Sequence, residues 1–172
     1  MTVLEGTVLA GRSFDPITGR VVVEDGRIAA VEEGETDSTD IILPAFVNAH
    51  THLGDSVAKE AAVGLDLEAA VAPPNSLKHR RLAAASHEAL VTAMRRTLQF
   101  MRQTGTVTCL DFRESGVEGA RALREAAAPL AVEPFIFGSD DPAVLDVADG
   151  FGARGANDDD FTDQRAAART AD

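Results

Sequence analysis

The chain has 172 residues, 45% of them apolar, so it is long enough to bury the core of one ordinary domain. Its formal net charge of −12 disfavours nucleic acid and anionic membranes as partners. No segment has the features of a signal peptide or approaches the roughly 18 apolar residues of a membrane helix, so we expect a cytoplasmic protein.

The basic residues are almost all arginine. The chain has 14 Arg but only two Lys, Lys59 and Lys78. Strong acidity with few lysines is typical of a halophilic protein, whose self-repulsion is screened because the Debye length falls to about 3 Å at 1 M salt. An ordinary acidic cytoplasmic protein is the alternative. Cys109 is the single cysteine, which excludes an intrachain disulfide, and its apolar surroundings favour a role as a small core residue.

The first 43 residues have the pattern of a small antiparallel sheet. Residues 3–10 form a β-rich run, and residues 20–24 and 27–31 are separated by Asp25-Gly26. An Asp-Gly pair between two such runs predicts a two-residue type I′ turn. Residues 32–40 follow as an acidic linker without periodicity.

The next stretch is an apolar strand that ends in two histidines, His50 and His52. Side chains alternate faces along a strand, so both imidazoles project to the same side, roughly 6.5–7 Å apart along the backbone. Two imidazoles placed in this way can coordinate the same cation. The alternative is a pair of polar residues on a solvated strand end, but the buried run before them and the glycine-containing loop after them favour metal ligation.

The remainder alternates between helices and buried strands. Residues 56–67 are weakly helical, Pro73-Pro74 break that helix, and a long helix is predicted over 78–103. Its apolar face comprises Leu90, Met94, Leu98 and Met101, and Gly105 is placed to end it in the left-handed conformation. The further elements are a strand over 106–112, a helix over 116–127, a strand over 131–137, a helix over 141–149, a short strand over 150–152 and a helix over 160–172.

Two details of these elements are expected from local rules. Val117, Ala120, Leu123 and Ala127 share one helix face, and Arg121 can pair with Glu125 across one turn. Pro134 lacks a donor, so we expect irregular pairing of its strand. Alternation of buried strands with helices predicts a parallel sheet covered by helices.

The run Pro44-Ala45-Phe46-Val47-Asn48-Ala49-His50-Thr51-His52 resembles the P-G-F-[IV]-[ND]-x-H-x-H signature of the amidohydrolase superfamily, with Ala45 in place of the usual glycine. The resemblance implies an α/β fold in which this run closes the first strand of a (β/α)8 TIM-type barrel. A complete barrel takes about 250 residues. We therefore expect residues 1–43 to be part of a small β-sandwich, and residues 44–172 to be the first half of a truncated barrel.

The resemblance also implies a divalent metal, zinc or iron, held by His50 and His52. The third ligand and two further site residues of such enzymes, two His and an Asp, come from later strands, and no histidine follows His87. We therefore expect an incomplete catalytic set in this chain. Members with two metals bridge them with a carboxylated Lys on the fourth strand, but no Lys follows Lys78, which favours the mononuclear, deaminase-like branch.

Two further residues are candidate substrate contacts. Arg113 follows the second barrel strand, where barrel loops carry such contacts, although it could equally be a surface residue of the next helix. His79 could lie on a loop that covers the site, although a solvated helix start is the favoured alternative. Asp55 and Asp111 could orient a ligand or cap a turn, His87 is expected on a helix surface, and Asp158-Asp159-Asp160 lack the remaining features of a calcium loop.

The sequence thus predicts a hydrolase of non-peptide carbon–nitrogen bonds in a small molecule, with deamination as the favoured subclass. The alternatives are a non-catalytic fragment or one subunit of a split enzyme. Because half a barrel leaves an unpaired sheet edge, self-association or a partner chain at that edge is expected.

Overall fold

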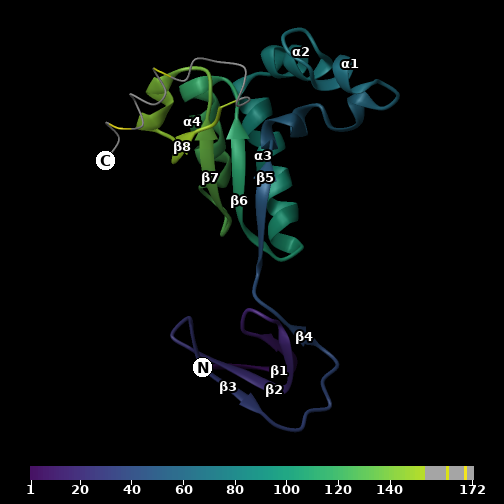
Figure 1. Ribbon diagram of the computed structural model, residues 1–172, viewed down its shortest axis with the longest axis vertical. Coiled ribbons are helices and arrows are strands. Elements are labelled where there is room, and N and C mark those ends of the chain that lie inside the picture. Colours follow the sequence, from purple (N-terminus) through teal and green to yellow (C-terminus); the bar gives the residue numbers. More distant parts are fainter. Residues whose placement is uncertain (154–161, 163–168, 170–172) are drawn as a thin grey trace. The chain divides into compact units, whose positions relative to one another are not determined.

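The structure, a computed structural model, describes residues 1–153, Thr162 and Arg169. The chain divides into two units, Met1–Ala45 and Phe46–Asp172. Each unit contains one four-stranded sheet (Figure 1).

The first unit is a four-stranded sheet with the strand order β3-β2-β1-β4. Its strands are β1 (Thr2–Ala10), β2 (Asp15–Glu24), β3 (Arg27–Glu33) and β4 (Ile41–Ile42). The first three pair antiparallel, whereas β4 pairs parallel to β1. The predicted hairpin is confirmed: Asp25 and Gly26 have φ angles of 49° and 74°, as a type I′ turn requires. Strand β2 begins earlier than predicted because it pairs with β1 as far as Asp15.

The second unit contains a parallel sheet with the order β5-β6-β7-β8. Its strands are β5 (Phe46–Thr51), β6 (Thr106–Arg113), β7 (Glu133–Gly138) and β8 (Gly150–Phe151). Within the described residues this sheet remains open, with β5 and β8 at its edges, so the barrel is partial. The strand–helix alternation and the parallel pairing predicted from the sequence are confirmed.

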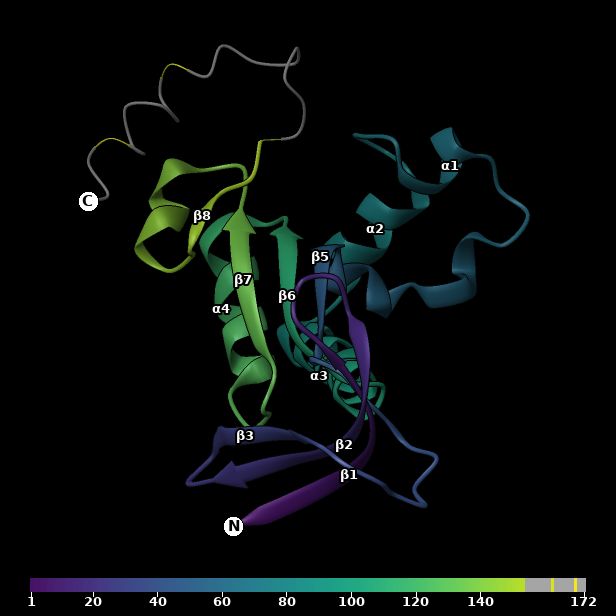
Figure 2. The ribbon, with the colours of Figure 1, turned by 60° about the horizontal axis from the view of Figure 1, so that its bottom comes forward.

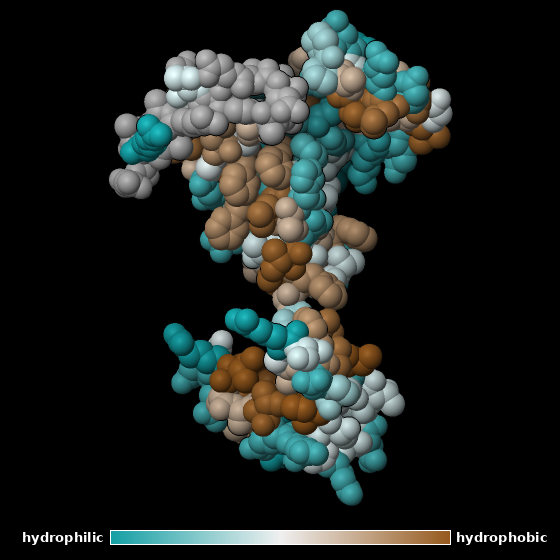
Figure 3. Space-filling model, viewed as in Figure 1, coloured by the Kyte–Doolittle hydropathy of each residue, from teal (hydrophilic) through white to brown (hydrophobic). Residues whose placement is uncertain are grey.

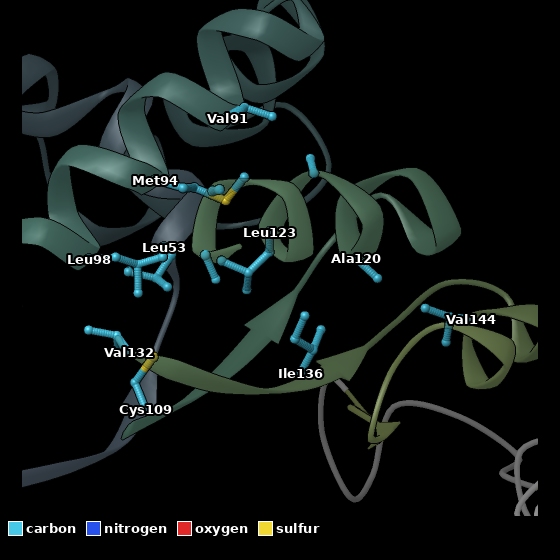
Figure 4. Close-up of a cluster of buried hydrophobic side chains, with 13 residues drawn as sticks. Leu53, Val91, Met94, Leu98, Cys109, Ala120, Leu123, Val132, Ile136 and Val144 are labelled. Atoms are coloured by element: carbon cyan, nitrogen blue, oxygen red, sulfur yellow. The ribbon is translucent and has the colours of Figure 1, made fainter. Parts of the chain in front are cut away.

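Two helices cover one face of this sheet, α3 (His87–Gln103) and α4 (Gly116–Ala127), as two views show (Figures 1 and 2). The core lies between these helices and the strands (Figure 4). Its fully buried members include Met94 and Leu98 of α3, Leu123 of α4, Cys109 of β6 and Ile136 of β7. The predicted apolar helix faces and the core position of Cys109 are confirmed.

The segment between β5 and α3 differs from the prediction. The expected helix over 56–67 is replaced by two 3₁₀ turns, η1 (Leu53–Val57) and η2 (Lys59–Ala62), followed by α1 (Leu67–Val71). The long helix predicted over 78–103 is two helices, α2 (Leu77–Ala84) and α3, because the Ser86 side chain accepts the N–H of Ala89 and starts a new helix. Gly105 has the expected positive φ, 89°.

Three smaller predictions were wrong. The expected helix over 141–149 is a 3₁₀ turn, η3 (Pro142–Asp146), in which Pro142 occupies the first turn. Arg121 pairs with Glu118 at 2.9 Å instead of Glu125. Pro134 does not disturb the register of β7 with β6. It lies near the start of β7, whereas β8 pairs only with Phe137 and Gly138, so the N–H that proline lacks is not needed for pairing with β8. The helix predicted over 160–172 falls largely outside the described residues.

Exposed apolar side chains remain on the strands of the second unit, where brown surface is visible in Figure 3. Phe46, Val47 and Phe135 are 54%, 60% and 45% exposed. Such uncovered apolar surface is what half a barrel presents where the remaining strands would close over it. In the described part of the chain, no helix has the length and apolarity to cross a membrane.

Candidate functional site

The two histidines lie together at the carboxyl end of β5. Their ring centroids are 5.1 Å apart, and the Nε2 atoms of His50 and His52 approach to 3.2 Å. Two nitrogens bound tetrahedrally to one zinc ion at about 2.0–2.1 Å lie about 3.3 Å from each other. The pair therefore fits two positions of a metal site, and the shared projection expected from their spacing is present.

The other ring nitrogen of His52 faces acceptors. Its Nδ1 lies 3.2 Å from the Phe112 carbonyl oxygen and 3.4 Å from Glu114 Oε1. The hydrogen bond with Glu114 raises the pKa of His52, against the opposing effects of burial and of the Lys78 charge. A neutral His52 with its proton on Nδ1 keeps the Nε2 lone pair free for a cation.

A buried carboxylate determines how the chain leaves β5. Asp111 of β6 is fully buried and accepts hydrogen bonds from the Leu53 N–H at 2.5 Å and the Thr51 hydroxyl at 3.0 Å. Burial raises the pKa of Asp111, although the Arg113 charge and the two hydrogen bonds act in the opposite direction. Because Thr51 and Leu53 flank His52, this carboxylate holds the residues on both sides of that histidine, through the Thr51 side chain and the Leu53 backbone.

Charged side chains form a compact cluster beside the histidines. Glu114 contacts Lys78 through Oε1 at 2.6 Å and Arg113 through Oε2. Lys78 also contacts Asp55 at 3.1 Å, and Arg113 contacts Asp111 at 3.5 Å. Burial alone would raise the pKa of Glu114, but the hydrogen bond with His52 and the charges of Arg113 and Lys78 outweigh it and lower that pKa. Glu114 is therefore a carboxylate at neutral pH.

The two histidines, together with Lys78, Arg113 and Glu114 of this cluster, border a cleft of about 730 Å³ at the carboxyl ends of the strands. Helix α2 and the end of α1 contribute one wall, with Val71, Lys78, His79 and Leu82. Phe112 lies on the other side, its ring 4.7 Å from that of His50 and 5.5 Å from that of Phe137. The cleft thus combines apolar and aromatic walls with a few polar groups, as small-molecule sites do.

The two expected substrate contacts lie in different surroundings. His79 lines the cleft, and its Nδ1 is 2.7 Å from the Ser76 hydroxyl. Arg113 also borders the cleft, but its side chain is 3% exposed, and its guanidinium contacts Asp111, Glu114 and the Met94 sulfur. This arrangement favours a role for Arg113 in holding neighbouring groups.

Neither Asp55 nor His87 lines the cleft. Asp55 reaches the cluster through Lys78, and His87 is an exposed first residue of α3 that pairs with Glu125 at 2.8 Å. Asp158-Asp159-Asp160 lie outside the described residues. Glu114 and Lys78 were not identified as site residues from the sequence. The position of Glu114 just after a barrel strand is a usable signal, whereas nothing local distinguishes Lys78.

The described residues bring no group of three His, Cys, Asp or Glu side chains into metal-binding proximity. Catalytic zinc generally has three protein ligands and an open position for water. At this position the described residues provide two imidazoles, one ligand fewer than such a site takes.

Comparison with known proteins identifies relatives over most of the chain. A model of the amidohydrolase family matches residues 41–169. A protein of Methanothermobacter thermautotrophicus described as "putative aminohydrolase" is 38% identical over 153 aligned positions, and the match covers 85% of this chain and 40% of that protein. A protein of Methanocaldococcus jannaschii is 33% identical over 168 aligned positions, with 90% of this chain and 44% of that protein covered. The chain thus spans about two fifths of the length of these relatives.

Solved structures show the same fold. Zinc-complexed atrazine chlorohydrolase TrzN of Arthrobacter aurescens TC1 aligns with a TM-score of 0.59 at 16% sequence identity. The alignment covers 81% of this chain and 36% of that enzyme. At this identity the likeness concerns the fold alone, and it places the described sheet in a partial barrel of that type.

Proposed function

Because this chain belongs to the amidohydrolase family, we propose that it supplies the first part of a hydrolase acting on a non-peptide carbon–nitrogen bond of a small molecule. The observation that carries the proposal is the 3.2 Å approach of the two Nε2 atoms of His50 and His52 at the mouth of a cleft. Deamination is the favoured subclass, since the fourth strand of the parallel sheet, β8, carries no lysine that could bridge a second metal.

In this proposal His50 and His52 hold a divalent cation, zinc or iron. A bound cation supplies Lewis acidity, which makes a water molecule nucleophilic near neutral pH. The chain's own residues orient the ligands and shape the cleft. Asp111 fixes the backbone around His52, Phe112 and Phe137 offer an aromatic wall, and His79 is placed to contact a substrate from α2.

The expected role of Arg113 changes in this proposal. Its buried guanidinium already contacts two carboxylates, so a bidentate contact with a substrate carboxylate or phosphate would require breaking those contacts. We assign it to holding Asp111 and Glu114 in place, and we assign the substrate contact to His79.

Metal binding is tested with Co²⁺, whose absorption spectrum reports ligation, and with Zn²⁺ titration calorimetry. His50→Ala and His52→Ala should each weaken binding at least tenfold. His87→Ala is the matched control, because His87 is exposed on α3 and pairs with Glu125, and it should leave binding unchanged. Equal affinities in all four proteins would refute the assignment. Ammonia release from small amides and aminated heterocycles tests the reaction itself.

A second candidate is one subunit of a split enzyme. The open sheet, the exposed apolar face and the lack of a third ligand among the described residues favour it. A non-catalytic fragment is the remaining alternative. Light scattering distinguishes the split-enzyme subunit from the non-catalytic fragment. A partner chain or self-association at the open edge raises the mass above that of one chain. A stable monomer without metal affinity favours the non-catalytic fragment.

A further inference from the structure

The Glu114 carboxylate is held at both oxygens. Lys78 Nζ lies 2.6 Å from Oε1, and the Arg113 guanidinium bonds Oε2. The side chain of Glu114 is 20% exposed and that of Arg113 is 3% exposed, so these pairs are shielded from water. A carboxylate bonded from two sides has little freedom to rotate, and its position is therefore determined by the fold.

This carboxylate faces the Nδ1 edge of His52. Oε1 lies 3.4 Å from Nδ1, and the Phe112 carbonyl oxygen lies 3.2 Å from it. A carbonyl and an ionised carboxylate only accept hydrogen bonds, so Nδ1 must carry the proton. The Nε2 lone pair of His52 is then directed to the same side as Nε2 of His50, 3.2 Å away. Of the two acceptors, Glu114 alone adds negative charge, which makes the imidazole a stronger ligand.

Lys78 brings a second segment into this arrangement. It is the second residue of α2, and its ammonium lies between the carboxylates of Asp55, which follows β5, and Glu114, which follows β6. Its side chain is 13% exposed. It therefore links the segment after β5, which carries His52, to the segment after β6, and it holds α2 beside the cleft.

We propose that Glu114 and Lys78 are positioning residues for His52: Glu114 fixes the imidazole with its proton on Nδ1, and Lys78 fixes Glu114. This inference rests on the proposed metal site for its consequence, while the contacts of Glu114 with His52 and Lys78 are made by the chain's own residues.

Two readouts separate the inference from the proposed function. Long-range ¹⁵N–¹H NMR of the metal-free full chain reports which nitrogen of His52 carries the proton, and Co²⁺ titration reports affinity. The variants are Glu114→Gln, Lys78→Met and the conservative Lys78→Arg. Glu118→Gln and Lys59→Met serve as matched controls, since Glu118 and Lys59 are exposed. Circular dichroism verifies that each variant is folded.

We expect Nδ1–H in the unmodified chain and a partial shift to Nε2–H in Glu114→Gln, with Co²⁺ affinity about 10–100-fold lower. Lys78→Met should weaken Co²⁺ binding in the same direction, and Lys78→Arg should restore it to within about threefold of the original, because the charge near Glu114 is retained. Both controls should behave like the unmodified chain.

Nε2–H on His52 in the unmodified chain would overturn the inference, as would a Glu114→Gln variant unchanged in both readouts. If the unmodified chain shows the expected Nδ1–H and its shift in Glu114→Gln but fails to bind Co²⁺ through His50 and His52, the positioning role stands and the metal proposal fails. If Glu114→Gln does not fold, Lys78→Met and Lys78→Arg provide the same test, because they remove or keep the positive charge that holds Glu114.

Discussion

Replacement of Asp111 by alanine tests whether a buried carboxylate holds the turn that carries His52. The substitution leaves the Leu53 N–H without its acceptor, takes one of two acceptors from the Thr51 hydroxyl, which keeps the Leu110 carbonyl oxygen, and removes one ionic partner of buried Arg113. A hydrogen bond to a charged group contributes about 1.5–3 kcal/mol. Breaking a buried ion pair from one side costs about 3–5 kcal/mol. These effects overlap, so we expect Asp111→Ala to lower the free energy of unfolding by about 3–5 kcal/mol.

Asp111→Asn is the sharper variant. Its amide oxygen keeps one acceptor, and a neutral group does not carry the desolvation cost of a carboxylate, so we expect a loss of about 1–2 kcal/mol. Urea unfolding followed by circular dichroism measures both values. Asp146→Ala is the control, because Asp146 is exposed, and it should stay within about 0.5 kcal/mol of the unmodified chain. A loss below about 1 kcal/mol for Asp111→Ala, or equal losses for Ala and Asn, would refute the reasoning.

Three further outcomes follow from the same region. Burial raises the pKa of Asp111 in the folded chain above its unfolded value of about 3.9, so protonation of this carboxyl stabilises the folded state; that stabilisation is complete below the unfolded pKa and is lost as pH rises through the folded pKa. In urea unfolding, the free energy of unfolding of the unmodified chain should therefore rise relative to that of Asp111→Asn from pH 7 to about pH 4, and a fall would contradict the prediction. A Cβ at Gly54 would overlap the Arg113 guanidinium, so Gly54→Ala should cost about 1–3 kcal/mol in urea unfolding, whereas Gly34→Ala, whose Cβ meets nothing, should be nearly neutral. Burial raises the pKa of the Cys109 thiol to about 11, so iodoacetamide should alkylate it at about pH 8 only after unfolding, as mass spectrometry would show; rapid labelling of the folded chain would contradict its burial.

The sequence by itself determined the features that depend on neighbouring residues. The Asp25-Gly26 turn requires positive φ at both positions, which few other pairs tolerate. The one-residue spacing of His50 and His52 at a strand end brings both rings to one side. The apolar face that contains Met94 and Leu98 follows from helical periodicity, and these side chains are buried as expected.

Other features required the tertiary structure because they join residues far apart in the chain. The break between α2 and α3 is not one of them: it is a local cap, in which the Ser86 side chain accepts the Ala89 N–H, and helical periodicity alone did not reveal it. The cluster of Asp55, Lys78, Arg113 and Glu114 combines α2 with the ends of two strands, and no local pattern brings Lys78 to Glu114. A charged side chain near a strand end can bind substrate or hold a neighbour, and burial decides between these roles. That burial depends on the whole fold, which is why the sequence located Arg113 at the site while the structure showed what its guanidinium contacts.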